Sequence, residues 1–348
     1  CQAFDSILRT FCNPGDYILA EEYSFSATVN AAKAQGVKPV SLKMDNHGIV
    51  PEYLEDLMNA WPKDLKKPKL LYTIPTGQNP QSSSLSSERK QQIYGILQKH
   101  DILIVEDEPY YFLQTGEYIP KSERKEVKFN SQQDFIESLA TSFLSIDTDG
   151  RVMRMESYSK VLAPGVRLGF IAGSAAIMKK LAANHLTSIM APSSFSQVFL
   201  NELLYTWKQE GYIDWLIGLR HEYTLKRDGT LDYLLEHMPK EFLENDIVRI
   251  NPPVAGMFFT IDINAAKHKN YNGDKIAMEE YINNKFVDAG VIVAPGSWFE
   301  VGSPEEISAV KKIERDGYIF YRATFAASDL PQIQEGIAKV IRFLMAET

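Results

Sequence analysis

Lys69-Leu70-Leu71-Tyr72-Thr73-Ile74 is a nearly continuous apolar run, as expected of a strand buried on both faces of a sheet. An amphipathic stretch at 86–100 and a second apolar run at 102–105 follow it. The same alternation extends in both directions, with strands expected at 17–20, 37–42, 152–155 and 168–172 and helices at 24–35 and 51–60. This order predicts an α/β protein with a mostly parallel sheet and helices on both sides.

The pattern changes in the last third of the chain. A long helix is expected at 211–238, and after it come strands at 248–250 and 256–263, a helix at 275–289, two short strands and a closing helix at 330–346. We therefore expect a large domain over 1–210 and, over 211–348, the long connecting helix with a smaller α+β domain. A charge-rich stretch at about 116–143, with Lys121, Glu123, Arg124, Lys125, Glu126 and Lys128, predicts a solvated insertion.

The composition of the 348 residues is typical of a globular protein, with 45% hydrophobic and 24% charged residues. A formal net charge of -8 argues against nucleic acid as a partner, and no apolar run is long enough to span a membrane. Two cysteines, Cys1 and Cys12, cannot build a disulfide framework or a metal cluster, which favours a reducing compartment, the cytoplasm. The chain opens inside an amphipathic helix without Met, so we expect that a further N-terminal stretch precedes it.

Chemically useful side chains follow the buried strands, where ligands bind in open α/β sheets. Those side chains lie in the stretches Glu21-Glu22-Tyr23, Pro75-Thr76-Gly77-Gln78-Asn79-Pro80, Glu106-Asp107-Glu108-Pro109-Tyr110 and Glu156-Ser157-Tyr158-Ser159-Lys160. Four adjacent strand ends can thus deliver an aromatic ring, an amide, a carboxylate with a phenol, and a lysine to one crevice.

Lys160 follows the small hydroxyls of Ser157 and Ser159, and Arg167 comes seven residues later. A covalent aldehyde cofactor with a phosphate tail needs such a set, because the amine forms a Schiff base and the hydroxyls and guanidinium hold the phosphate. The motif alone is weak, since Ser-x-Ser-Lys occurs by chance and most lysines are solvated.

Each of the other candidates also has a purely structural explanation. Asn79 could close a turn, with a cis bond to Pro80, and Asp107 could cap a helix. Tyr23 and Tyr110 could be ordinary boundary aromatics. Arg322 could be paired on a surface, although an Arg at a strand end flanked by apolar residues best pairs with a bidentate carboxylate.

Five segments together resemble the pyridoxal-phosphate-dependent aminotransferases of fold type I, class I. They are 72–80, Val105-Glu106-Asp107-Glu108-Pro109-Tyr110-Tyr111, Ser157-Tyr158-Ser159-Lys160, Pro164-Gly165-Val166-Arg167-Leu168-Gly169 and Tyr321-Arg322-Ala323-Thr324-Phe325. The chain is most similar to the fungal aromatic and the kynurenine/α-aminoadipate aminotransferases. The resemblance implies a homodimer with active sites at the subunit boundary.

The resemblance also implies roles for the candidate residues. Lys160 would carry pyridoxal 5′-phosphate and shuttle the substrate proton, and Asp107 would pair with the pyridine nitrogen. Asn79 and Tyr110 would bind the phenolate oxygen, and Tyr23 would stack on the ring. Four further roles are implied: Ser157, Ser159 and Arg167 would bind the phosphate, and Arg322 the substrate carboxylate. The family's phosphate-binding turn would lie just before the first helix seen here.

Substrates follow from the subfamily resemblance alone. We expect an aromatic amino acid, 2-aminoadipate or kynurenine as donor and 2-oxoglutarate as acceptor. Trp298, Phe299 and Tyr23 are candidate pocket walls, although Trp298 could equally pack in the core. Two alternatives are an aminotransferase-like domain of a transcription regulator and another reaction of the same fold, such as β-elimination or decarboxylation.

Overall fold

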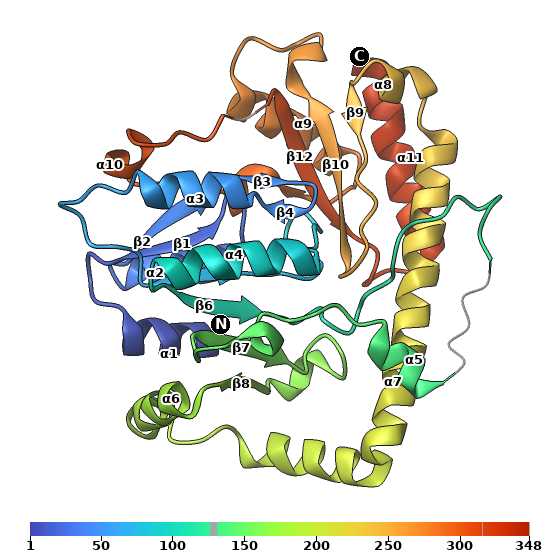
Figure 1. Ribbon diagram of the computed structural model, residues 1–348. Helices are drawn as coiled ribbons and strands as arrows, with labels where there is room; N and C mark the ends of the chain where they lie inside the picture. Colours follow the sequence, from blue (N-terminus) through green and yellow to red (C-terminus); the bar gives the residue numbers. More distant parts are fainter. Residues whose placement is uncertain (126–130, 315, 348) are drawn as a thin grey trace.

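The computed structural model describes residues 1–125, 131–314 and 316–347. A six-stranded sheet lies at the centre of the larger part of the molecule (Figure 1). Its order is β2-β1-β5-β6-β7-β8, and only β8 runs antiparallel to its neighbour. The strands are β1 (Tyr17–Glu21), β2 (Lys38–Leu42), β5 (Leu70–Thr73), β6 (Leu103–Asp107), β7 (Val152–Ser157) and β8 (Gly169–Gly173). The expected mostly parallel sheet is confirmed.

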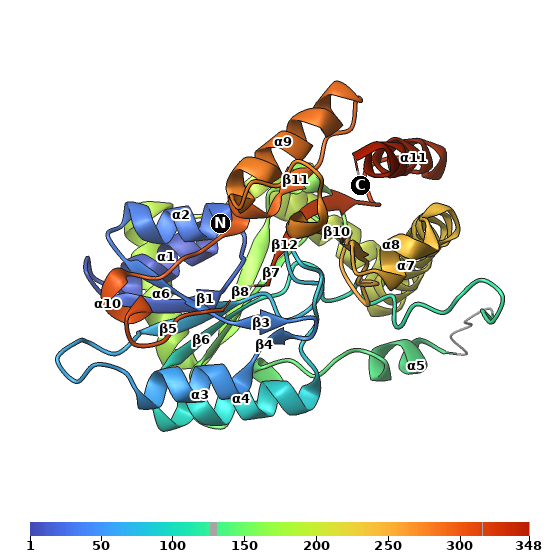
Figure 2. The same ribbon diagram turned by 90° about the horizontal axis from the view of Figure 1, so that it is seen from above.

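Helices cover both faces of this sheet, as Figure 2 shows from above. Leu19, Leu71 and Ile104 point toward α3 (Pro51–Asn59) and α4 (Ser87–Lys99). The alternate strand residues, such as Tyr72 and Val105, face the helices α1 (Gln2–Phe11), α2 (Ser26–Ala34) and α6 (Ala175–Ser188). Because both faces are buried, the strands lack a polar side, which explains their continuous apolar runs.

A second, antiparallel sheet of order β11-β12-β10-β9 lies beside the first. Its strands are β9 (Val248–Arg249), β10 (Phe258–Asn264), β11 (Ala294–Pro295) and β12 (Tyr318–Thr324). One face packs on α9 (Lys275–Asp288), α11 (Leu330–Glu347) and the end of α7 (Ser194–His237). The remaining elements are the hairpin β3 (Met44–Asp45) and β4 (Gly48–Ile49), the helices α5 (Gln132–Glu137), α8 (Lys240–Glu244) and α10 (Glu305–Ser308), and short 3-10 turns at Leu144–Ile146, Pro164–Val166, Ala265–Lys267 and Gly296–Phe299.

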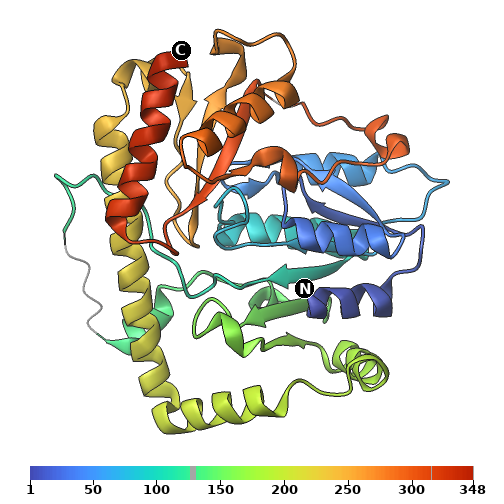
Figure 3. The same ribbon diagram turned by 180° about the vertical axis from the view of Figure 1, so that it is seen from behind.

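The helix expected at 211–238 is the second part of α7. A kink at Lys208, where φ is 54°, separates it from a first helical part that begins at Ser194 and was not expected. Figure 3 shows α7 beside α11, and Gly229 permits this close packing because a Cβ there would lie 2.6 Å from Leu330 Cδ2. None of the described helices combines the length and apolarity that a membrane span requires.

The charged insertion is less solvated than expected. Lys121, Glu123 and Lys125 are exposed, whereas Arg124 bonds the carboxylates of Asp228 and Asp232 on α7. Phe135 of α5 is also buried and packs near α7. The prediction of a solvated insertion was therefore wrong for Arg124 and for α5. The ion pairs of Arg124 and the buried ring of Phe135 hold these segments against α7. Glu126 and Lys128 lie outside the described residues.

The two sheets are joined by a close backbone contact between Gly77 and Gly256. Gly77 has φ +58°, and a Cβ there would lie 2.6 Å from the backbone nitrogen of Gly256.

We expect Gly77→Ala to lower the free energy of unfolding by about 2 kcal/mol or more, because left-handed strain and a backbone clash add together. Gly95→Ala is the control: nothing lies within 4 Å of its Cβ position on α4, and the change should stabilise by up to about 1 kcal/mol. Urea unfolding midpoints test both, and equal midpoints would contradict the contact.

Candidate active site

Four of the parallel strands, β1, β5, β6 and β7, are neighbours in the sheet. The residues that follow them therefore meet at one edge, as the sequence predicted. These segments carry Tyr23, Asn79, Asp107 with Tyr110, and Lys160.

Asp107 is the last residue of β6, and its side chain is half-buried. The Tyr72 hydroxyl donates to Asp107 Oδ2 at 2.7 Å, and Thr28 Oγ1 donates to the Tyr72 hydroxyl at 3.2 Å. Burial raises the pKa of Asp107, while the Tyr72 hydrogen bond lowers it. The next helix, α5, begins only at Gln132, so the helix-cap alternative for Asp107 is wrong.

Asn79 links the first sheet to Arg322 of the second. Arg322 Nη1 donates to Asn79 Oδ1 at 2.6 Å, and the Asn79–Pro80 bond is cis. The guanidinium carbon of Arg322 lies 4.2 Å from the ring centre of Phe258 and 4.7 Å from that of Phe299. The surface-pair alternative for Arg322 is therefore wrong, since an amide and two rings fix a half-buried guanidinium.

Tyr110 and Lys160 belong to the same electrostatic cluster. Tyr110 is buried, and burial and Asp107 raise its pKa, while Arg322 and a hydrogen bond with Asn79 oppose the shift. Burial lowers the pKa of the half-buried Lys160, and the positive charges of Arg167 and Arg322 lower it further. The Lys160 amine is thus easier to deprotonate than that of a solvated lysine.

Donors for an anion gather in the turn that follows β7. Arg167 Nη1 donates to Ser159 Oγ at 3.1 Å and to the carbonyl oxygen of Pro164 at 3.1 Å, and the backbone N–H of Ser159 donates to Ser157 Oγ at 3.2 Å. The Arg167 side chain is exposed, and its backbone has φ 50°. A non-glycine residue in this left-handed conformation is often a functional one. Two hydroxyls and a guanidinium together suit a phosphate.

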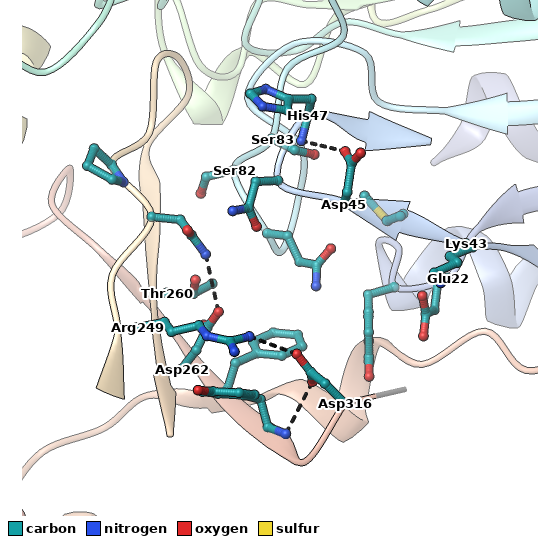
Figure 4. Close-up of a pocket in the computed structure, with 18 of the residues that line it drawn as sticks. Glu22, Lys43, Asp45, His47, Ser82, Ser83, Arg249, Thr260, Asp262 and Asp316 are labelled. Atoms are coloured by element: carbon teal, nitrogen blue, oxygen red, sulfur yellow. Dashed lines mark hydrogen bonds and ion pairs between the residues drawn. The ribbon is translucent and has the colours of Figure 1, made fainter. Parts of the chain in front are cut away.

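Tyr23 lies in different surroundings from the other candidates. Its ring meets Phe320 edge-on at 4.9 Å and lines a cavity of about 600 Å³ between the β3–β4 hairpin and the second sheet. Figure 4 shows charged side chains of both signs around this cavity, among them Asp45, Arg249 and Asp262. Among the residues that the structure describes, its lining includes neither Lys160, Asp107 nor Arg322.

Several contributors were missed in the sequence. Tyr72 is a phenol within an apolar strand, and that polar atom was the available signal for its bond to Asp107. Phe258 lies against Arg322 and was missed, because no local pattern reveals a contact between distant segments; Phe299, the other ring beside Arg322, was expected as a pocket wall. Phe25 follows β1 and packs against the cluster that contains Tyr72 and Tyr110.

Comparisons with known proteins agree with this geometry. The family model for aminotransferase class I and II matches residues 1–339. An aromatic amino acid aminotransferase of Schizosaccharomyces pombe is 38% identical over 340 residues, which cover 96% of this chain and 68% of that protein. The bovine mitochondrial kynurenine/alpha-aminoadipate aminotransferase is 35% identical over 269 residues, 76% of this chain and 56% of that protein.

A solved structure extends the likeness to three dimensions. The crystal structure of the aminotransferase Aro8 from Candida albicans superposes with a TM-score of 0.93 and 46% identity, over 99% of this chain and 71% of that one. The present chain spans about two-thirds of the length of the curated fungal relatives. It belongs to the class I and II aminotransferases, which are enzymes that depend on pyridoxal phosphate.

Proposed function

We propose that this enzyme transfers the amino group of an aromatic amino acid, 2-aminoadipate or kynurenine to 2-oxoglutarate, with pyridoxal 5′-phosphate on Lys160. The observation that carries the proposal is the cluster of a half-buried lysine of lowered pKa with Arg167 and Arg322. The names of the fungal aromatic and the bovine aminoadipate relatives support the choice of donor.

The residues present fit the cofactor. Half-buried Asp107 suits a protonated ring nitrogen as its partner, and Asn79 and Tyr110 suit the phenolate oxygen. The hydroxyls of Ser157 and Ser159 and the guanidinium of Arg167 suit the phosphate. When bound, pyridoxal phosphate supplies the sink for the electrons left at the substrate Cα. For the ring face, the sequence proposed Tyr23, and the packing of Phe25 makes it a second candidate.

The side chains of this protein handle the substrate and its proton. The Lys160 amine would take the proton from the substrate Cα as a general base, and its lowered pKa favours the neutral form that this requires. Arg322 presents a flat guanidinium to the substrate carboxylate, so that a bidentate pair fixes the orientation of Cα.

The walls beside Arg322 suit an apolar side chain. Phe258 and Phe299 are 8% and 5% exposed and lie on the guanidinium, next to the proposed carboxylate position. Trp298 is 63% exposed, so the alternative that it packs in the core is wrong. It remains a candidate wall, together with Tyr23.

A coupled assay tests the proposed substrates. Phenylalanine and 2-aminoadipate, each supplied with 2-oxoglutarate and pyridoxal phosphate, should yield glutamate and the matching keto acid. If neither donor yields a keto acid, the proposal fails. Release of pyruvate from a cysteine conjugate without glutamate formation would instead show β-elimination.

We also propose that the enzyme is a homodimer. An apolar surface, which we call the α6–α7 face, consists of Leu186, Met190, Phe195, Val198, Phe199 and Tyr205, with exposures of 69%, 80%, 90%, 61%, 54% and 78%. Contiguous apolar side chains of this size mark interaction sites, and two-fold self-association is the commonest way in which soluble proteins cover them. Trp215, farther along α7, donates its indole N–H to the carbonyl oxygen of Val161, the residue after Lys160.

Phe195→Glu tests the dimer. A charge at the centre of a buried apolar interface should shift the protein to monomers, as measured by sedimentation equilibrium. Ile292→Glu is the matched control, because Ile292 is also 90% exposed but lies beside the second sheet. Dissociation by Ile292→Glu and not by Phe195→Glu would contradict the proposed surface.

Two organisational proposals complete the picture. We propose a cofactor-binding domain over 1–210 and a second unit over 211–348; the boundary falls two residues after Lys208, where α7 departs from helical geometry. Cys1 and Cys12 are free thiols, which supports a reducing compartment such as the cytoplasm.

A further inference from the structure

Glu21 is a carboxylate at the carboxyl end of β1, and it is only 1% exposed. Its Oε1 accepts hydrogen bonds from Thr73 Oγ1 at 2.6 Å and from the backbone N–H of Ile74 at 3.1 Å. Its Oε2 accepts a bond from Gln78 Nε2 at 2.9 Å. Burial and the charge of Asp107 on β6 raise the pKa of Glu21 to about 7, while these three donors oppose the shift. The hydrogen bonds of Glu21 thus link β1 to the end of β5 and the segment after it. Burial of a carboxylate costs free energy, which these bonds offset.

Gln78 uses its remaining polar groups to close the turn that carries Asn79. Its Nε2 also donates to the carbonyl oxygen of Tyr23 at 2.7 Å, and its Oε1 accepts the N–H of Gln81 at 2.8 Å. Its backbone N–H bonds the carbonyl of Ser83 at 2.9 Å, and its carbonyl accepts the N–H of Ser82 at 2.6 Å. The backbone and the side chain of Gln78 therefore both bond to other residues of the turn 78–83. Glu21 fixes that side chain through its bond to Nε2.

The opposite side of this turn touches the second sheet. Ser82 Oγ donates to the carbonyl of Phe258 at 2.8 Å, and Asn79 Oδ1 receives Arg322 Nη1 at 2.6 Å. Phe258 is also one of the two rings on the Arg322 guanidinium. Any shift of the turn therefore moves both the hydrogen-bond partner of Arg322 and the backbone of one ring that flanks it.

We propose that Glu21 and Gln78 form a buried clamp that sets the position of Asn79 and, through Asn79, the orientation in which Arg322 receives the substrate carboxylate. Glu21 is thus a positioning residue for substrate binding. A charged acceptor makes the bond to Gln78 stronger than a neutral one would. The inference rests on the proposed role of Arg322 and adds a determinant that touches neither the cofactor lysine nor the substrate.

Exchange of single atoms tests the clamp. Glu21→Gln keeps the shape and can still accept from Thr73 and Ile74, but it sets an amide NH₂ against Gln78 Nε2. Gln78→Glu instead sets two carboxylates together. We expect the Kd of the holoenzyme for 3-phenylpropionate, a carboxylate without an amino group, to rise by about tenfold in each variant because Arg322 loses its orientation. The KM for the amino acid should rise with it, while kcat changes less than twofold and the visible absorbance of the holoenzyme stays unchanged.

The double variant Glu21→Gln/Gln78→Glu restores an amide–carboxylate bond in the reverse direction. It should bind 3-phenylpropionate more tightly than either single variant. Its affinity should stay below that of the wild type, because the bond to the Tyr23 carbonyl is lost. Thr73→Val is a control that removes a donor to Glu21 but leaves the bond to Gln78, so it should alter the unfolding midpoint and not Kd. Glu22→Gln is a second control, since this neighbouring buried carboxylate lines the cavity of Figure 4.

The outcomes separate the clamp from the wider proposal. If both single variants bind 3-phenylpropionate as tightly as the wild type, the clamp is refuted while the aminotransferase proposal stands. If Thr73→Val weakens binding as much as Glu21→Gln, Glu21 acts through strand stability, and the positioning role is wrong. If the wild type itself does not bind the probe, the proposed role of Arg322 fails. Should Glu21→Gln not fold, Gln78→Glu alone decides.

Discussion

Parallel pairing of β1, β5, β6 and β7 is the constraint on which the site depends. Strands that run in the same direction end at the same edge, so residues distant in the sequence become neighbours there. Asp107 and Lys160 are brought together in this way, and β12 of the second sheet adds Arg322. The candidate groups lie at the ends of the strands, such as Asp107 on β6, or in the segments that follow, such as Lys160 after β7, so the sheet serves as a rigid support for them.

The alternation of side chains along β6 separates two kinds of buried charge. Asp107 points to the face that carries Tyr72, while Glu106 points to the other face and pairs with Arg154 at 3.0 Å. Glu106 also accepts the backbone N–H groups of Phe143 and Leu144, so its charge is balanced within the protein. Among the described residues, the Tyr72 hydroxyl is the side chain that donates a hydrogen bond to Asp107, and a half-buried carboxylate so placed favours a cationic partner.

The same reasoning explains why polar contacts gather at Asn79. Glu21, Gln78 and Ser82 form hydrogen bonds that fix one short turn, and each of them is nearly inaccessible to water. A buried polar group is stable only when its partners are fixed, so such a network rigidifies what it touches. Rigidity here is useful because Arg322 must meet a flat carboxylate with matched geometry.

The sequence predicted the parallel sheet, the second small sheet and most candidate residues, because apolar runs and motif spacing are local signals. The position of Asn79 after β5 and of Lys160 after β7 followed from strand order alone. The helix at 211–238 was predicted, whereas the first part of α7, from Ser194 to the kink at Lys208, was missed. The bond from Tyr72 to Asp107 and the contact of Phe258 with Arg322 were missed as well, because they join segments far apart in the chain.

The position of Arg124 against α7 could not be predicted from the sequence either. A charged stretch indicates exposure on average, but two carboxylates on α7 and the buried ring of Phe135 override that average here. Tyr23 shows the converse case, in which a residue at the expected strand end faces a neighbouring cavity lined by charges. Both depend on the packing of separate elements.

Reductive trapping tests the central claim most directly. The holoenzyme is treated with sodium borohydride and digested, and the peptides are analysed by mass spectrometry. A covalent link between pyridoxal phosphate and the lysine that follows β7 predicts one phosphopyridoxyl group, carried by Lys160. A modification at any other lysine, with Lys160 unmodified, would contradict this account.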